Sequence, residues 1–219
     1  MKFIEKLNKD LEHWFLLNHP FYQAWNAGLL SKQILTIYAK EYYHHVAAFP
    51  RYISQIHAKC NNLEDRQVLL DNLIDEEQGS ENHPELWLRF LTGISGSRVI
   101  DHDPTLQKTK NLVDGYFSLT QKDYATGLGA LYAYERQTPE VAKSKIYGLK
   151  QFYKVADEET LKFFLVHQEA DEWHTEEIIN LLNKLSPEEQ ANAAQGAITG
   201  AKLLWGFLDE MHTQNHSYH

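Results

Sequence analysis

Apolar residues recur at spacings of three and four positions along almost the whole chain. This spacing matches the turn of an α-helix, and the strict alternation of a half-buried strand is nowhere sustained. Clusters of Gly, Pro, Asn and Asp interrupt the pattern where the chain is expected to turn. The sequence therefore predicts an all-α fold, with helices over residues 2–17, 20–27, 31–58, 63–78, 84–92, 105–120, 124–152, 157–184 and 186–211.

Two positions predict breaks in this pattern. Gly79, followed by serine, is expected to end the helix that starts near residue 63. Pro139 falls inside a predicted helix, where its ring clashes with the carbonyl group of Glu135 and it donates no hydrogen bond. Pro139 either kinks this helix beside Glu135 or begins a new helix after Gln137, and both interpretations stay open.

The chain has 219 residues, 43% of them hydrophobic, so it can bury one core without covalent cross-links. We expect one domain over residues 1–211 and a polar, disordered tail over residues 212–219. A formal net charge of -9, with no cluster of Lys and Arg, argues against nucleic acid as a partner. The same charge disfavours acidic membranes, and no apolar segment is long enough to span a bilayer.

Cys60 is the single cysteine, so the chain cannot form an internal disulfide. As the nucleophile of a thiaminase it would need a base that no sequence feature supplies, and we therefore expect a structural thiol. The N-terminal segment lacks the continuous apolar run of a secretory signal. These features predict a cytoplasmic protein.

The strongest chemical signal is a row of polar residues on the predicted helix 157–184. His167, Asp171 and His174 follow one another at steps of four and three residues, which places them on one helix face. The same face is apolar before and after the row, so these residues fall where the pattern demands core. Buried without partners they would cost on the order of several kcal/mol, which a metal ion would compensate. The alternative is a pairing of Asp171 with a histidine on a solvated face.

Two carboxylates on other predicted helices favour the metal. An apolar stripe ends at Glu76 in one helix, and a second stripe ends at Glu135 in another. One Glu from each of two helices, with a carboxylate and histidines on a third, is the ligand supply of helical dimetal sites. Oxygen and imidazole ligands without thiolate favour iron or manganese over zinc.

His83 needs a turn in the chain to reach the same site. On a straight helix it would lie about 10.5 Å along the axis from Glu76. The expected break at Gly79 removes this obstacle, and Pro84 suits the first position of a new helix. His83 would then be the N-cap residue, where the chain turns back toward the site as a mobile metal ligand.

Several segments resemble one known family. They are Phe21-Tyr22, Tyr38 to Tyr43, Ala48 to Pro50, Leu70 to Glu77, Ala130 to Glu135 and His167 to His174. Together, within residues 8–211, they are similar to the family of the Chlamydia protein associating with death domains. That family is related in fold to the pyrroloquinoline-quinone synthase PqqC and to TenA-type thiaminases. The resemblance implies a seven-helix heme-oxygenase-like bundle.

The resemblance also implies a dinuclear centre, Fe/Fe or Fe/Mn, that uses O2 and an external reductant. The family is linked to folate biosynthesis as an oxygen-dependent source of para-aminobenzoate, and the aromatic ring is thought to come from a tyrosine of the protein itself. An oxidoreductase of this kind is therefore expected. The family's metal ligands match Glu76, His83, Glu135, His167, Asp171 and His174.

Four residues gain a role only from the resemblance. Tyr22 matches the consumed tyrosine, Tyr38 and Tyr134 match flanking redox-active positions, and Lys145 matches a lysine proposed to donate the amino group. From the residues alone, Tyr22 is a packing residue with a bonded hydroxyl group and Lys145 is a surface lysine. Tyr134 would line a cavity wall, and His45 is interpreted as a satisfied core histidine in preference to a cavity residue.

Other functions stay open beside the self-consuming enzyme. The same metal site could oxidise a diffusible small substrate, or the chain could be a host-directed binding protein whose metal is structural. A cofactorless oxidase would have no use for six metal-type side chains. We expect a homodimer. The C-terminal tail of the chlamydial protein is not matched, so binding to a host death-domain protein is not expected.

Overall fold

The computed structural model describes the backbone of residues 2–217 and the side chains of this range apart from residues 169–172 and 216–217. This described part contains helices and no strand, which confirms the all-α fold. The α-helices are α1 (Phe3–Leu11), α2 (Pro20–Asn26), α3 (Lys32–Lys59), α4 (Leu63–Glu77), α5 (His83–Ser95), α6 (Gln107–Lys122), α7 (Tyr124–Glu135), α8 (Thr138–Phe152), α9 (Glu158–Asn183) and α10 (Pro187–Ser217). Two short 3-10 helices, η1 (Glu12–Trp14) and η2 (Leu16–Asn18), connect α1 to α2.

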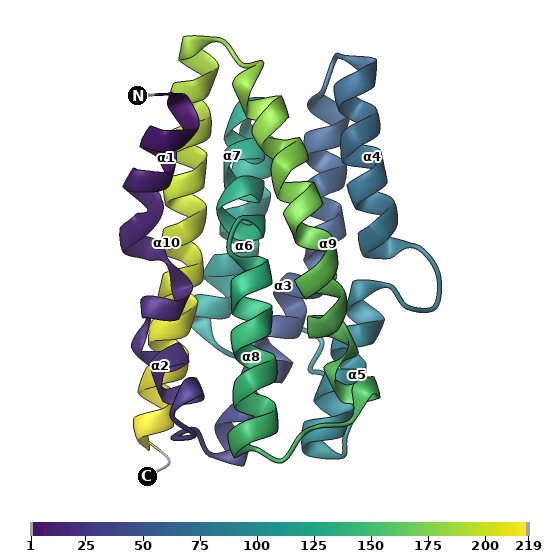
Figure 1. The fold of residues 1–219 in the computed structure, drawn as a ribbon, viewed down its shortest axis with the longest axis vertical. Helices are drawn as coiled ribbons and strands as arrows, with labels where there is room; N and C mark the ends of the chain where they lie inside the picture. Colours follow the sequence, from purple (N-terminus) through teal and green to yellow (C-terminus); the bar gives the residue numbers. More distant parts are fainter. Residues whose placement is uncertain (1, 218–219) are drawn as a thin grey trace.

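The long helices lie side by side along one axis of the molecule (Figure 1). Helix α3 contacts α4, α5, α6, α7 and α10, and the most extensive contact between helices joins α7 to α10. Helix α9 packs on α5, α7 and α8. Aromatic side chains such as Trp25, Tyr38 and Trp87 fill the core between them. No helix in the described part of the chain is both long and apolar enough to cross a membrane.

The structure divides the bundle into more helices than the seven expected. The first predicted helix ends at Leu11 and continues as 3-10 turns. The predicted helix 124–152 is two helices, because Arg136 and Gln137 separate α7 from α8. Pro139 lies in the first turn of α8, where its missing amide hydrogen costs nothing. The prediction that Pro139 begins a new helix is confirmed, and the single kinked helix is wrong.

Helix α10 continues to Ser217, beyond the end expected at residue 211. Leu208, Met211 and Asn215 are buried at spacings of three and four residues, so the helix keeps an inward face there. The expectation of a disordered tail from residue 212 is therefore wrong as far as Ser217.

Helices α7 and α10 come very close because glycine stands at their crossing. A Cβ atom on Gly129 would lie 1.9 Å from the carbonyl oxygen of Ala193, and one on Gly196 would lie 2.1 Å from that of Thr126. Both distances are far shorter than a van der Waals contact, so neither position accepts a larger residue without movement of a helix. The close crossing thereby determines the position of α7 relative to α10. Glu135 is the last residue of α7.

Replacing Gly129 with alanine should push α7 away from α10. Overpacking of this kind costs about 1–3 kcal/mol, and each kcal/mol lowers Tm by roughly 2–4 °C in a chain of this size. Thermal unfolding followed by circular dichroism measures the change. Gly206→Ala is the matched control on α10, because the nearest atom to its Cβ would be 3.9 Å away and alanine favours a helix. A Gly129→Ala protein that melts at or above the wild-type temperature would contradict the close packing.

Candidate metal centre and adjoining cavity

Three side chains from different helices converge on one point. Glu76 lies near the end of α4, His83 opens α5 and His167 lies in α9. One ligand atom from each lies within 4.8 Å of the others, and we call these three residues the metal triad. Nδ1 of His83 is 2.6 Å from Oε2 of Glu76, yet the angle is not that of a hydrogen bond. A carboxylate oxygen and two imidazole nitrogens aimed at a common space fit iron or manganese.

The turn between α4 and α5 brings His83 back beside Glu76. Gly79 has a φ of 81°, in the left-handed region that favours glycine, which confirms the predicted break. The side chain of Asn82 accepts the amide hydrogen of Glu85 and caps α5. His83 is therefore the first helical residue and not the N-cap as expected. On a straight helix Glu76 and His83 would lie far apart along the axis. Because the chain turns at Gly79, the two side chains lie next to each other.

The protonation states of the two histidines differ. Nδ1 of His167 donates to the carbonyl oxygen of Phe163 at 2.6 Å, because a carbonyl can only accept, and this leaves Nε2 free for a metal ion. Burial and the neighbouring charge of His83 hold the pKa of His167 well below its usual range. Burial is the largest influence on the pKa of His83 and lowers it, but the interactions with Glu76 and the charge of Asp75 together outweigh burial and raise this pKa. His167 is thus neutral at neutral pH, which is the form that binds metal.

Glu135 and His174 lie close to the metal triad without joining it. Oε1 of Glu135 accepts a 2.8 Å hydrogen bond from Asn72, whereas Oε2 has no hydrogen-bond partner among the described side chains. Burial raises the pKa of Glu135 to about 8; the bond from Asn72 opposes this rise, and the charge of Glu76 adds to it. Nε2 of His174 lies 3.1 Å from Asp75, and burial lowers the pKa of His174. An unpartnered buried carboxylate oxygen is an available metal ligand.

Asp171 lies outside the described side chains, so its predicted place beside His167 and His174 is not tested. Both of these histidines are buried, as the apolar pattern on their helix face predicted. The structure therefore brings together three of the six predicted ligands, Glu76, His83 and His167. The second half, made of Glu135, Asp171 and His174, stays a prediction.

Sequence reasoning missed three polar residues around the predicted ligands. Asn72 holds Glu135, and Asp75 holds His174. Oε2 of Glu177 is buried and lies 3.7 Å from Nδ1 of His174. Asn72 lies four residues before one predicted ligand and Glu177 lies three residues after another, so helical spacing could have identified both. The partner of His174 could not be found this way, because Asp75 belongs to another helix.

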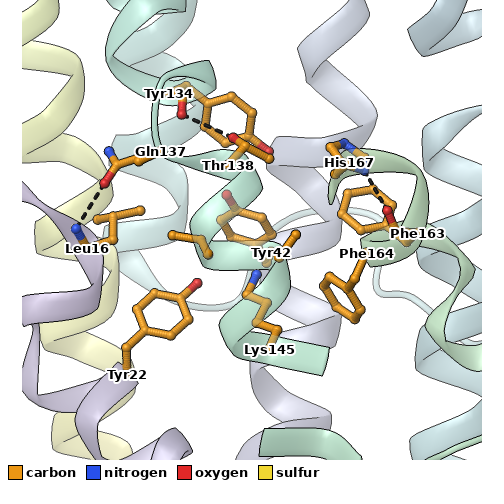
Figure 2. A pocket seen from close by; sticks show the side chains of 12 residues that line it. Leu16, Tyr22, Tyr42, Tyr134, Gln137, Thr138, Lys145, Phe163, Phe164 and His167 are labelled. Carbon is orange, nitrogen blue, oxygen red and sulfur yellow. Dashed lines mark hydrogen bonds between the residues drawn. The ribbon is translucent and has the colours of Figure 1, made fainter. Parts of the chain in front are cut away.

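A small cavity adjoins His167 (Figure 2). Its free volume is about 20 Å³, which is room for about one water molecule; a cavity that binds benzene measures about 150 Å³. The cavity therefore accommodates a molecule of the size of O2 or water and not a free aromatic ring. Among the side chains that line it are Tyr22 of α2, Tyr42 of α3, Tyr134 of α7, Lys145 of α8 and Phe164 of α9.

Lys145 is buried in this wall, whereas the residues alone predicted a surface lysine. Its amine donates a 2.7 Å hydrogen bond to the hydroxyl group of Tyr38. The amine also lies 5.1 Å from the ring centre of Tyr38 and 5.6 Å from that of Tyr22. Burial lowers the pKa of Lys145 to about 7. The neutral, nucleophilic amine is therefore well populated at neutral pH.

The tyrosines predicted to matter meet at the same place. The hydroxyl groups of Tyr22 and Tyr38 are 3.2 Å apart. Tyr134 lines the cavity as expected, in the same wall as Tyr42. Tyr22 is buried with a bonded hydroxyl group, as the packing interpretation required, but it also faces the cavity. Both interpretations of Tyr22 are thus compatible with its surroundings.

Two residues with other expected roles lie apart from the metal triad. His45 is fully buried, but neither ring nitrogen has a hydrogen-bond partner among the described residues, so the satisfied core histidine is wrong. Burial lowers the pKa of His45 to about 3, and the ring is neutral. Cys60 is buried and its thiol donates to the carbonyl oxygen of Asn62 at 3.4 Å. The structural thiol is therefore confirmed.

The sequence model of a family described as iron-containing redox enzymes, of the heme-oxygenase type, matches residues 36–205. The chain belongs to this family. This heme-oxygenase-like protein is 42% identical to a Chlamydia pneumoniae protein described as 4-aminobenzoate synthase, over 94% of its own length and 92% of that of the relative. A Chlamydia muridarum protein with the same description is 38% identical over 95% and 89% of the two chains. The resemblance inferred from the motifs is confirmed.

A solved structure confirms the architecture of this heme-oxygenase-like protein. The structure is a Shewanella denitrificans domain described as having a heme oxygenase-like fold. The two superpose with a TM-score of 0.83 at 18% sequence identity, over 100% of this chain and 95% of the other. At this identity the likeness concerns the fold alone. The family that the sequence matches is described as iron-containing. The oxygen and nitrogen donors of the metal triad are compatible with iron.

Asn72 should control metal affinity through Glu135. Asn72→Ala removes the donor that orients the Glu135 carboxylate, and loss of such an outer partner typically weakens metal binding about 10–100-fold. Titration of the metal-free protein with Fe(II) against a competing chelator measures the affinity. Asn111→Ala is the control, because Asn111 is exposed on α6. Equal affinities for Asn72→Ala and wild type would show that Asn72 does not position a ligand.

Metal-free protein should lose stability as the pH rises toward 8. The pKa of Glu135 is raised to about 8 in the folded chain, so folding retains a proton that the unfolded chain releases above its lower pKa. The stability contribution is complete below pH of about 4 and falls by up to about 1.4 kcal/mol per pH unit until the folded pKa is passed. Urea unfolding at several pH values measures the slope. Glu135→Gln should flatten it, and an unchanged slope in that variant would refute the assignment.

Proposed function

We propose that this protein forms para-aminobenzoate from its own Tyr22, with O2, a reductant and a pair of metal ions, Fe/Fe or Fe/Mn. Relatives that share more than a third of its residues over nearly the whole chain are described as 4-aminobenzoate synthases. The structural observation that carries the proposal is the small cavity, which Tyr22, Lys145 and His167 all line. Because the cavity has no room for a diffusible aromatic substrate, a ring in its wall is the substrate that fits.

The metal triad would hold one ion, and Glu135, Asp171 and His174 would hold the other. The donor set supports this assignment, since it consists of carboxylates and imidazoles, and Nδ1 of His83, Oε2 of Glu135 and Nδ1 of His174 have no hydrogen-bond partner among the described residues. When bound, the metal pair supplies the activation of O2 and the oxidising equivalents.

The chain's own residues would position the Tyr22 ring, exclude water from it and provide the Lys145 amine as a nucleophile. Aromatic rings surround the cavity and exclude bulk water from Tyr22. The Tyr22 hydroxyl group is held against that of Tyr38, which in turn accepts the hydrogen bond from Lys145. This contact keeps the amine within reach of the ring that would receive nitrogen. The lowered pKa of Lys145 leaves a lone pair on the amine at neutral pH.

Tyr22→Phe should abolish product formation and leave the fold and the metal content intact. The substitution removes one hydroxyl group from a buried ring, and the phenol O–H bond is the one that an oxidant can break. Protein expressed with ring-labelled tyrosine is loaded with Fe(II), given reductant and O2, and analysed by mass spectrometry. The wild type should release labelled para-aminobenzoate, up to a single equivalent per chain, with a matching mass loss in the peptide that contains Tyr22.

Tyr52→Phe is the matched control, because Tyr52 is equally buried but bonds only the carbonyl oxygen of Val113. It should form product at the wild-type level. Lys145→Ala should keep the metal and lose the product if its amine is the nitrogen source. Several turnovers per chain, or product from Tyr22→Phe at the wild-type rate, would show that a diffusible substrate is used.

A further inference from the structure

The tyrosines that carry the proposed function are a pair, Tyr22 and Tyr38, and a third residue, Tyr134, on another helix. Tyr22 and Tyr38 touch through their hydroxyl groups at 3.2 Å. Tyr134 lies on α7 directly before Glu135, a predicted metal ligand. Tyr22 and Tyr38 lie on α2 and α3, whereas the tyrosine beside the metal site lies on α7. An oxidising equivalent that arises at the metal ions would have to cross the space between them.

Tyr42 occupies this space (Figure 2), where its ring stands between Tyr134 and Lys145. The ring of Tyr42 is stacked on that of Tyr38, with centroids 5.5 Å apart and planes inclined by 13°. On its other side, Tyr42 lines the same cavity wall as Tyr134, and Tyr134 opposes the rise that burial causes in the pKa of the Tyr42 phenol. Tyr42 is therefore stacked on Tyr38 and lies in the same cavity wall as Tyr134.

The other rings around Tyr42 do not offer the same connection. Trp87, Phe207 and His45 lie 5.1 Å, 5.3 Å and 5.4 Å from it, measured between ring centroids. His45 lies against Tyr134 at 5.3 Å, but its ring contacts among the described residues do not include Tyr38. Phe207 has no hydroxyl group, and the indole N–H of Trp87 is bonded to the carbonyl oxygen of Ala39 at 2.7 Å. Tyr42 is thus the member of its cluster that can exchange a hydrogen atom toward both Tyr134 and Tyr38.

The surroundings favour transfer of a neutral hydrogen atom over transfer of a bare electron. Tyr38 and Tyr42 are buried, and burial raises the pKa of both phenols, so neither ionises beforehand. A charged radical in this dry core would lack solvation. The amine of Lys145 lies 5.1 Å and 5.3 Å from the two ring centres, and its protonated form would further oppose a positive ring. Electron and proton therefore move together.

We propose that Tyr42 is a further redox-active residue, which relays the oxidising equivalent from Tyr134 to Tyr38 and hence to Tyr22. This inference rests on the proposed function. When bound, the metal pair would supply the oxidising equivalent from O2 and reductant, and the hydroxyl group of Tyr134, next to the predicted ligand Glu135, would give up the first hydrogen atom. The Tyr134 radical takes one from Tyr42, and Tyr42 takes one from Tyr38.

In the last step, the Tyr38 radical takes the hydrogen atom of Tyr22 across their hydroxyl contact. In each step one O–H bond breaks and one forms, so the radical moves toward Tyr22 while a hydrogen atom moves the other way. No net charge enters the core. The oxidant gains one electron and one proton, and Tyr22 ends as the neutral phenoxyl radical.

The test places 3-aminotyrosine at position 22, where its easily oxidised O–H bond traps the radical. The protein is loaded with Fe(II), mixed with reductant and O2, freeze-quenched and examined by electron paramagnetic resonance. Tyr42→Phe should lower the yield of trapped radical at least about tenfold. Its metal content and Tm should stay at the wild-type values, since Phe preserves the stacked ring. Tyr52→Phe, from the same helix, should leave the yield unchanged.

The outcomes separate the relay from the proposed function. A wild-type yield of radical in Tyr42→Phe would overturn the relay, even if para-aminobenzoate is formed. A yield that depends on Tyr42 would support the relay even if the natural Tyr22 were retained and no product appeared, which would overturn only the proposed function. A wild-type protein that forms no trapped radical would overturn the relay, because no oxidising equivalent then reaches Tyr22.

Discussion

Glu135, His167 and Lys145 lose their contact with water in the folded chain, and each loss needs compensation inside the bundle. Without metal, that compensation is a shift in protonation: the pKa of the carboxyl group rises and the pKa values of the imidazole and the amine fall. At neutral pH the Glu135 carboxyl group and the His167 ring are therefore mostly neutral, and a large share of the Lys145 amine is neutral too. A metal ion would reverse the situation for the carboxylate, because it favours the ionised ligand.

Much of the fold follows from the sequence alone. Apolar periodicity predicted the helices, and Gly79 and Pro139 marked real helix ends because their backbone preferences act locally. The number of helices and the extent of α10 depend on tertiary packing. Asn215 is buried against the bundle although its neighbours in sequence are polar, so local composition suggested a tail where the helix continues.

The candidate site was predictable where polar residues interrupt an apolar face, as His167 and His174 do on α9. Lys145 was missed by this reasoning, since a lysine on a helix is usually solvated and only the packing of Trp87, Tyr38 and Phe164 around its amine shows otherwise. The stacking of Tyr38 on Tyr42 was not predicted from the sequence for a related reason. These residues are one helical turn apart, but their contact gains meaning only from Tyr22 and Tyr134, which other helices supply.

The tyrosine proposed as substrate sits on α2, a segment of only seven residues that is separate from the helices carrying the metal triad. Loss of one ring there would leave the long helices of the bundle joined as before. The spent chain would then persist as a folded, inactive protein. Under the proposed function, the cell's supply of product would follow the rate of translation, and gene expression would take the place that a turnover number has for an ordinary enzyme.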